Sequence, residues 1–181
     1  MSDPMVLPTM RDDLDRVNIL FTCAGRRVEL LRAFRRAYAE ERLDGKIVAT
    51  DVDRLAPALR VADRAHLVPA SDDSEYLSVL RRICEEDEVN LVFPLSDVDI
   101  PVLASGKEVL ESPRCRIVVV DRDAARRTRD KWETHLLFEE LGIPGPRTWL
   151  APDGWVAEGR FPLVVKPRSG KPVNYPAFLK A

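Results

Sequence analysis

Short apolar runs alternate with helix-like segments through the first 120 residues, and this alternation constrains the fold more than any other feature. The runs are rich in Val, Ile and Leu and lack the polar–apolar alternation of a half-exposed strand, so we expect strands buried on both faces. They cover residues 17–22, 46–50, 66–69, 90–95 and 116–120. Short connections between strands and helices then predict an α/β fold with a Rossmann-like, doubly wound parallel sheet.

The segments between these runs have helical spacing. In the first, from Arg26 to Glu41, apolar residues recur on one face and arginines on the other. We predict helices over 26–41, 71–86 and 97–111, with a short helical piece near 56–62. In such sheets ligands bind at the carboxyl ends of the strands, so residues that follow each strand are the candidates for a site.

Residues suited to an anion follow the first strand. Gly25 lies in a turn, and Arg26 and Arg27 begin the next helix. Backbone N–H groups at a helix N-terminus, together with two arginines, would attract a substrate carboxylate or phosphate. A surface arginine at that position is also tolerated without any ligand, so both interpretations stay open. With only one glycine, the turn lacks the dinucleotide fingerprint G-x-G-x-x-G.

Four aspartates follow other strands and form a second group of candidates, namely Asp51, Asp53, Asp97 and Asp99. Paired carboxylates bind a substrate amine or a metal, but aspartate is equally common in caps and turns. We assign Asp97 to capping and prefer Asp51 for substrate binding. Cys23 has no neighbouring base in the sequence and is interpreted as a small packing residue.

Composition excludes several classes of function. The 28 basic and 30 acidic residues give a net charge of -2, which argues against a nucleic-acid partner. No apolar run approaches the length of a membrane span, and we expect a cytoplasmic protein with a small-molecule substrate. The three cysteines and two histidines have no metal-ligand spacing, so no metal site is predicted.

From Ala124 the pattern changes. A helix is predicted over 124–141, a Pro- and Gly-rich linker over 143–154, and then the phrase FPLVVKPRSG over 161–170. Its apolar run ends at Lys166, and a lysine buried at the end of a strand is costly unless an anion binds it. By spacing alone, the alternative of a lysine whose ammonium group extends to solvent is favoured. We therefore divide the chain into a flexible leader (1–16), a Rossmann-like domain (17–123) and the start of a second domain (124–181).

The order of these motifs resembles the ATP-grasp superfamily, and most closely its carbamoyl-phosphate-synthase-like ligases. The resemblance rests on AGRR, DVD and PLSD after successive strands, then Asp130-Lys131, LGIPGPRTW and FPLVVKPRSG. It implies a domain that precedes an ATP-grasp module, in a ligase that uses ATP and Mg²⁺. It also implies that Lys131 and Lys166 contact the nucleotide, and that an acylphosphate is attacked by an amine or a thiol.

After Gly170 the sequence departs from the family. The family continues with a Gly/Ser-rich loop over the phosphates, whereas this chain reads KPVNYPAFLKA, with two prolines that lack backbone donors. We therefore expect a truncated chain that does not catalyse the family reaction alone and pairs with a complementing subunit or a second copy of itself. The alternative is a non-catalytic Rossmann-like module that binds a small anionic metabolite or a partner subunit.

Overall fold

The structure, a computed structural model, describes residues 16–150, 163–169 and 177–179 of the chain. The chain divides into two compact units, Met1–Val119 and Val120–Ala181, and each is described by itself. Of the predicted leader over 1–16, only Arg16 lies within the described residues. None of the helices in these described ranges is long and apolar enough to cross a membrane.

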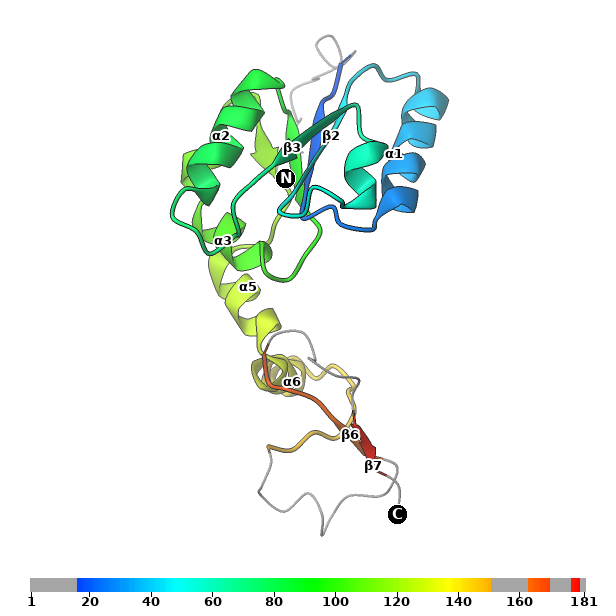
Figure 1. The fold of residues 1–181 in the computed structure, drawn as a ribbon. Coiled ribbons are helices and arrows are strands. Elements are labelled where there is room, and N and C mark those ends of the chain that lie inside the picture. Colours follow the sequence, from blue (N-terminus) through cyan, green and yellow to red (C-terminus); the bar gives the residue numbers. More distant parts are fainter. Residues whose placement is uncertain (1–15, 151–162, 170–176, 180–181) are drawn as a thin grey trace, which may run out of the picture. The chain divides into compact units, whose positions relative to one another are not determined.

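A five-stranded parallel sheet forms the centre of the first unit (Figure 1). Its order is β3-β2-β1-β4-β5, and its strands are β1 (Ile19–Thr22), β2 (Ile47–Asp51), β3 (Arg64–Leu67), β4 (Leu91–Pro94) and β5 (Arg116–Ile117). The predicted α/β fold with a parallel sheet is confirmed. Strand order reverses between β1 and β4, so the carboxyl ends of these two strands form the switch point at which open α/β sheets bind ligands.

Helices cover both faces of this sheet. They are α1 (Val28–Glu41), the 3-10 turn η1 (Pro57–Arg60), α2 (Tyr76–Glu86), α3 (Ile100–Ser105) and α4 (Lys107–Leu110). The single helix predicted over 97–111 is wrong, because the chain breaks into α3 and α4 at Gly106. At that break the backbone approaches α2 so closely that a Cβ on Gly106 would lie 2.6 Å from Cδ1 of Leu77. The predicted start of α2 at residue 71 is also wrong, since turns occupy residues 71–75.

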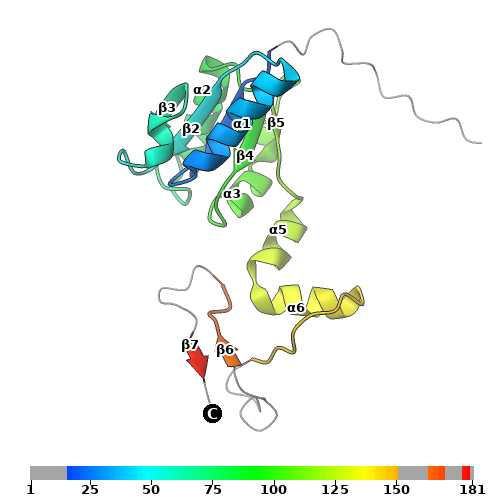
Figure 2. The same cartoon turned by 90° about the vertical axis from the view of Figure 1, so that its right-hand side faces the viewer.

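Alternation along β1 separates two hydrophobic cores. Ile19 and Phe21 pack on the α1 side with Leu31, whereas Leu20 packs on the α2 side with Leu80. The two helices lie on opposite faces of the sheet in both views (Figures 1 and 2). Thr22 ends the strand one position after Phe21, so its side chain belongs to the α2 face, at the carboxyl edge.

Gly45 allows the turn before β2 to approach the backbone just before β1. Gly45 has φ +146°, and a Cβ there would lie 2.0 Å from the carbonyl oxygen of Val17. The same approach lets the Val17 N–H donate to the carbonyl of Asp44 over 2.8 Å. The turn before β2 therefore packs directly against the start of β1.

The second unit contains α5 (Arg122–Arg129), α6 (Lys131–Glu140) and a pair of antiparallel strands, β6 (Leu163–Val165) and β7 (Ala177–Leu179). The single helix predicted over 124–141 is wrong, because Asp130 has extended backbone angles, φ -94° and ψ 118°, and separates two helices. Of the predicted linker, residues 143–150 have no regular secondary structure and 151–154 lie outside the described residues. The segment 171–181, where the sequence departs from the family, is described only for the backbone of β7.

Candidate functional site

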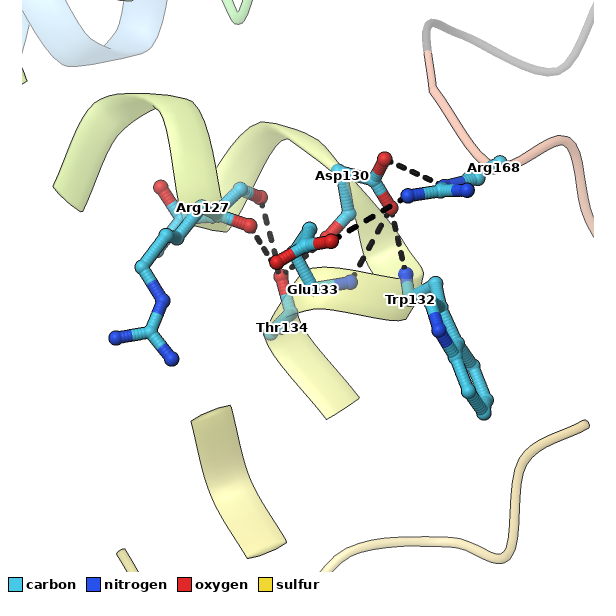
Figure 3. Close-up of polar contacts among 7 residues, drawn as sticks. Arg127, Asp130, Trp132, Glu133, Thr134 and Arg168 are labelled. Carbon is cyan, nitrogen blue, oxygen red and sulfur yellow. Dashed lines mark hydrogen bonds and ion pairs between the residues drawn. The ribbon is translucent and has the colours of Figure 1, made fainter. Parts of the chain in front are cut away.

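The N-terminus of α6 is organised by one carboxylate. Oδ1 of Asp130 accepts hydrogen bonds from the backbone N–H groups of Trp132, over 2.9 Å, and Glu133, over 3.2 Å. A side-chain cap of this kind satisfies donors that the first turn of a helix leaves unpaired. The Thr134 hydroxyl donates back to the carbonyls of Asp130 and Arg127, which fixes the corner between α5 and α6 (Figure 3).

Arg168 binds the same carboxylate from the turn that follows β6. Its Nε donates to Oδ2 of Asp130 over 2.6 Å, and its Nη2 lies 3.4 Å from Oε1 of Glu133 (Figure 3). The backbone carbonyl of Arg168 also accepts a hydrogen bond from the Lys131 N–H, over 2.9 Å. Side chain and backbone together hold this turn against the first residue of α6.

These contacts change the acidity of Asp130. Loss of hydration by itself would raise the pKa of its carboxyl group, but hydrogen bonds from the Glu133 N–H, Arg168 and the Trp132 N–H act in the opposite direction and lower it. The carboxylate therefore remains ionised where it caps the helix and binds Arg168.

The two lysines expected to contact nucleotide lie on the segments that Arg168 joins. Lys131 is the first residue of α6 and is half-buried, and Lys166 follows β6 and is exposed. The expectation of a buried strand ending in a costly lysine is wrong, because Val164 and Val165 are 49% and 44% exposed. Exposure removes the desolvation argument for an anion at Lys166, so its nucleotide contact remains a prediction from the family resemblance.

At the sheet edge of the first unit, two of the predicted substrate-binding residues are in direct contact. The Gly25 N–H donates to Oδ2 of Asp51 over 2.7 Å, and the Asp53 N–H donates to Oδ1 over 3.0 Å. Gly25 has φ +51°, a left-handed conformation that glycine adopts without strain. Asp51 therefore shapes the turns that follow β1 and β2, and substrate binding by Asp51 remains a prediction.

Arg26 and Arg27 are exposed at the start of α1. Nη1 of Arg27 donates to the carbonyl of Cys23 over 3.3 Å, which holds the side chain against the turn after β1. Among the residues that the structure describes, the Arg26 side chain forms no hydrogen bond or ion pair. An anion at these arginines stays a prediction.

At the same edge, sequence reasoning included Asp99 among four candidate aspartates but missed the buried polar group that it forms with Cys23 and Tyr76. Cys23, interpreted as a packing residue, has φ +48°, and its thiol lies 3.2 Å from Oδ1 of Asp99. Asp99 is completely buried, and Tyr76, which lies on the helix predicted over 71–86, is next to it. Position in the sequence was the signal that could have found this group. Tyr76 is the first residue of α2 and Asp99 immediately precedes α3, and both helices follow the carboxyl end of a strand.

Metal binding has no support in the described part of the chain. Within residues 16–150, 163–169 and 177–179, no group of three or more His, Cys, Asp or Glu side chains is arranged to hold an ion. No catalytic step through magnesium is assigned to these residues.

The parallel sheet with its switch point between β1 and β4 defines a doubly wound α/β protein, and its relatives are proteins of the ATP-grasp superfamily. The chain belongs to the family described as "PylC-like, N-terminal domain", whose model matches residues 19–119. It is 29% identical over 141 residues to a formate-dependent phosphoribosylglycinamide formyltransferase of Pelobacter propionicus, covering 72% of this chain and 33% of the relative.

Two further similarities concern the sequence and the fold. The chain is 29% identical over 139 residues to a 3-methyl-D-ornithine--L-lysine ligase of Methanosarcina acetivorans, covering 76% of this chain and 34% of that protein. The solved structure of an L-amino acid ligase from Bacillus licheniformis matches with a TM-score of 0.59 at 19% identity, over 91% of this chain and 39% of that one, and supports the fold. The chain thus spans about a third of the length of the curated relatives that it matches.

Proposed function

We propose that this chain is the N-terminal part of an ATP-dependent carboxylate–amine or carboxylate–thiol ligase. In the proposed reaction a substrate carboxylate attacks the γ-phosphorus of ATP and ADP leaves. The amine or thiol then attacks the carbonyl carbon of the acylphosphate, and phosphate leaves. Membership in the ATP-grasp family and similarity to a lysine ligase support this class of reaction.

The observation that carries the proposal is the attachment of the Arg168 turn to the start of α6. Because the Lys131 N–H donates to the Arg168 carbonyl over 2.9 Å, the two segments that bear Lys131 and Lys166 are adjacent. Two lysines on neighbouring backbone segments supply positive charge for the phosphates of one nucleotide. Arg168 itself is neutralised by Asp130 and Glu133, so we assign it a positioning role.

We propose that the sheet edge of the first unit holds the acceptor substrate. Gly25, Arg26 and Arg27 offer backbone donors and positive charge to a carboxylate or phosphate, and Asp51 orients the Gly25 turn. ATP is the proposed cofactor, and Lys131 and Lys166 are the residues proposed to bind it. We assign Mg²⁺ to the part of the family's length that has no counterpart in these 181 residues.

We further propose that the 181-residue chain does not complete the reaction by itself. Its match to about a third of each relative supports this statement. A complementing subunit or polypeptide segment would then provide the remaining ligands of the nucleotide and its metal.

Nucleotide binding can be tested by isothermal titration of the chain with ATP. We expect measurable binding that is weakened by Lys131→Ala and by Lys166→Ala. Lys46→Ala is the matched control, since it removes the same charge at the amino end of β2. Equal affinities in all four proteins would overturn the assignment of the two lysines.

A second candidate is a non-catalytic module that binds a small anionic metabolite or a partner subunit. It is favoured by the confinement of the family match to residues 19–119, which make up the sheet unit without Lys131 or Lys166. ATP binding of millimolar strength or weaker, together with tight binding of another anionic metabolite that is lost in an Arg26→Ala/Arg27→Ala double variant, would support this candidate instead.

A further inference from the structure

Buried polar atoms without hydrogen bonds gather at one place in the first unit. In the described part of the chain, four buried side-chain atoms have no hydrogen-bond partner, namely Thr22 Oγ1, Thr50 Oγ1, Tyr76 Oη and Asp99 Oδ2. Buried polar atoms are almost always paired, so each exception requires an explanation. Four exceptions at one edge of one sheet point to a shared cause.

Topology explains why these residues meet. Thr22 ends β1, and Asp99 follows β4, the neighbouring strand across the switch point. Tyr76 opens α2, which covers the face of the sheet that Leu20 contacts, and Thr22 is on this face two positions later. Thr50 has the same relationship to Val48 on β2, so its hydroxyl is on the same face beside Thr22.

The environment of Asp99 is unfavourable for a carboxylate. The residue is 0% exposed, its Oδ1 has the weak thiol donor of Cys23 at 3.2 Å, and its Oδ2 has no donor. Among the described residues no ion pair involves Asp99. A buried carboxylate without a cation is strongly penalised, so this arrangement favours a positively charged partner.

Tyr76 remains a neutral hydroxyl beside this carboxylate. Burial, followed by the negative charge of Asp99, raises the pKa of Tyr76 far above its ordinary range. The hydroxyl interacts with both Asp99 and Thr22 without forming a hydrogen bond of ordinary geometry to either. It is therefore available to accept a hydrogen bond from a third group.

We propose that Asp99, Tyr76 and Thr22 bind the primary ammonium group of a small molecule. An ammonium group carries three N–H donors and one positive charge. The cluster offers three oxygens without partners, one of them on a carboxylate that lacks a counter-ion. The location at the switch point is where open α/β sheets bind ligands. This inference gives the amine of the proposed ligase a site, but amine binding does not depend on ATP.

Cys23 provides a way to observe occupancy. It is half-buried, whereas Thr22, Tyr76 and Asp99 are buried, so Cys23 is the one of these four residues that a reagent in solution contacts. Cys84 and Cys115 are buried in the core, and the rapid reaction of native protein with a thiol reagent therefore reports Cys23. An ammonium group bound to Oδ2 of Asp99 leaves the contact of the Cys23 thiol with Oδ1 in place and shields the thiol from the reagent.

The test uses the full chain and compares three chloride salts at equal ionic strength: methylammonium, tetramethylammonium and potassium. We expect methylammonium to slow the alkylation of Cys23 by iodoacetamide and to raise the melting temperature in a saturable manner. Tetramethylammonium has no N–H donor and serves as the control, and it should do neither. Ammonium chloride forms a fourth arm that distinguishes a site for the free ion from a site for an organic amine.

Variants connect this effect to the cluster. Asp99→Asn keeps the shape of the side chain and removes its charge, and we expect half-saturation by methylammonium to weaken about tenfold. Tyr76→Phe and Thr22→Val should each weaken it by a smaller factor. Asp72→Asn removes the charge of an exposed aspartate four residues before Tyr76 and should have no effect. Circular dichroism of each variant establishes that the sheet unit is folded.

Equal responses to methylammonium, tetramethylammonium and potassium would overturn the proposal, as would full retention of the effect in Asp99→Asn. Stronger binding of ammonium than of methylammonium would assign the cluster to the free ion and would also overturn it. Loss of ATP binding with intact amine binding would contradict the ligase function and leave this site standing. Intact ATP binding that depends on Lys166, without amine binding, would contradict this site and leave the ligase function standing.

Discussion

The Nε atom of Arg168 lies 2.6 Å from Oδ2 of Asp130, and the two residues are 38 positions apart in the chain. The other oxygen of this carboxylate caps α6 through the N–H groups of Trp132 and Glu133. A single aspartate therefore starts a helix and holds a distant turn against it.

Substituting Arg168 by alanine should release this turn without a large change in global stability. Exposed ion pairs contribute little to the free energy of unfolding, so we expect the melting temperature to remain nearly unchanged. The Lys131 amide should instead lose protection from hydrogen exchange, because its acceptor is the Arg168 carbonyl. Arg126→Ala, which removes an exposed arginine paired with Asp123 at 2.9 Å, is the control. Unchanged protection of the Lys131 amide in Arg168→Ala would contradict the conclusion that the Arg168 side chain holds this turn against α6.

Acid should weaken the start of α6. Since the pKa of Asp130 is lowered below its ordinary value of about 3.9, folding favours the ionised carboxylate. Its contribution is present above about pH 4 and is lost as the pH falls through the lowered pKa. Exchange rates of the Trp132 and Glu133 amides between pH 6 and pH 2 measure this loss. Asp130→Asn retains a capping oxygen that does not titrate, so the acid transition should disappear in that variant.

Alkali should weaken the first unit through Tyr38. Its hydroxyl donates to the Val17 carbonyl over 2.6 Å, and burial, followed by the charge of Asp63, raises its pKa to about 12. Folding thus favours the neutral phenol, and this stabilisation is complete below about pH 10 and is lost as the pH rises towards 12. Urea unfolding should show Tyr38→Phe to be about 1 kcal/mol less stable at pH 8, with a smaller decline above pH 10. Parallel pH profiles for the two proteins would count against this account.

The α1 face of the sheet depends on one aromatic side chain. Phe21 is 0% exposed, and its ring centroid lies 4.9 Å from that of Phe34 and 5.7 Å from that of Phe93. We expect Phe21→Ala to cost about 3–5 kcal/mol of unfolding free energy, because it leaves a cavity between sheet and helix. Phe21→Leu fills most of that space and should cost clearly less in the same urea titration. Similar costs for the two variants would argue against a tightly packed site.

Gly45 should be the least replaceable glycine of the sheet unit. A Cβ at this position would lie 2.0 Å from the Val17 carbonyl oxygen, so Gly45→Ala adds a backbone collision to the strain of φ +146°. Gly25→Ala is the comparison, because φ there is +51° and the nearest atoms to a Cβ are 3.8 Å away. Left-handed strain alone costs about 1–2 kcal/mol. Urea unfolding should therefore show a larger loss for Gly45→Ala, and equal losses would remove the collision from the explanation.

Local pattern predicted most of the sheet unit. Strands rich in Val, Ile and Leu and a helix with apolar residues at Leu31, Phe34 and Tyr38 are visible in short windows of sequence, because burial on both faces imposes that composition. Helix boundaries were less predictable. Gly106 and Asp130 divide helices for reasons that lie elsewhere in the fold, namely close packing on Leu77 and the capping of α6.

The sequence by itself determined the α/β class, the family and the residues that follow each strand. Periodicity and motif order are properties of neighbouring residues, and they require no knowledge of distant contacts. Tertiary structure alone decided that Asp99, Tyr76 and Thr22 meet at the switch point and that Arg168 binds Asp130. Such pairings depend on strand order and on the packing of helices over the sheet, which bring together residues tens of positions apart.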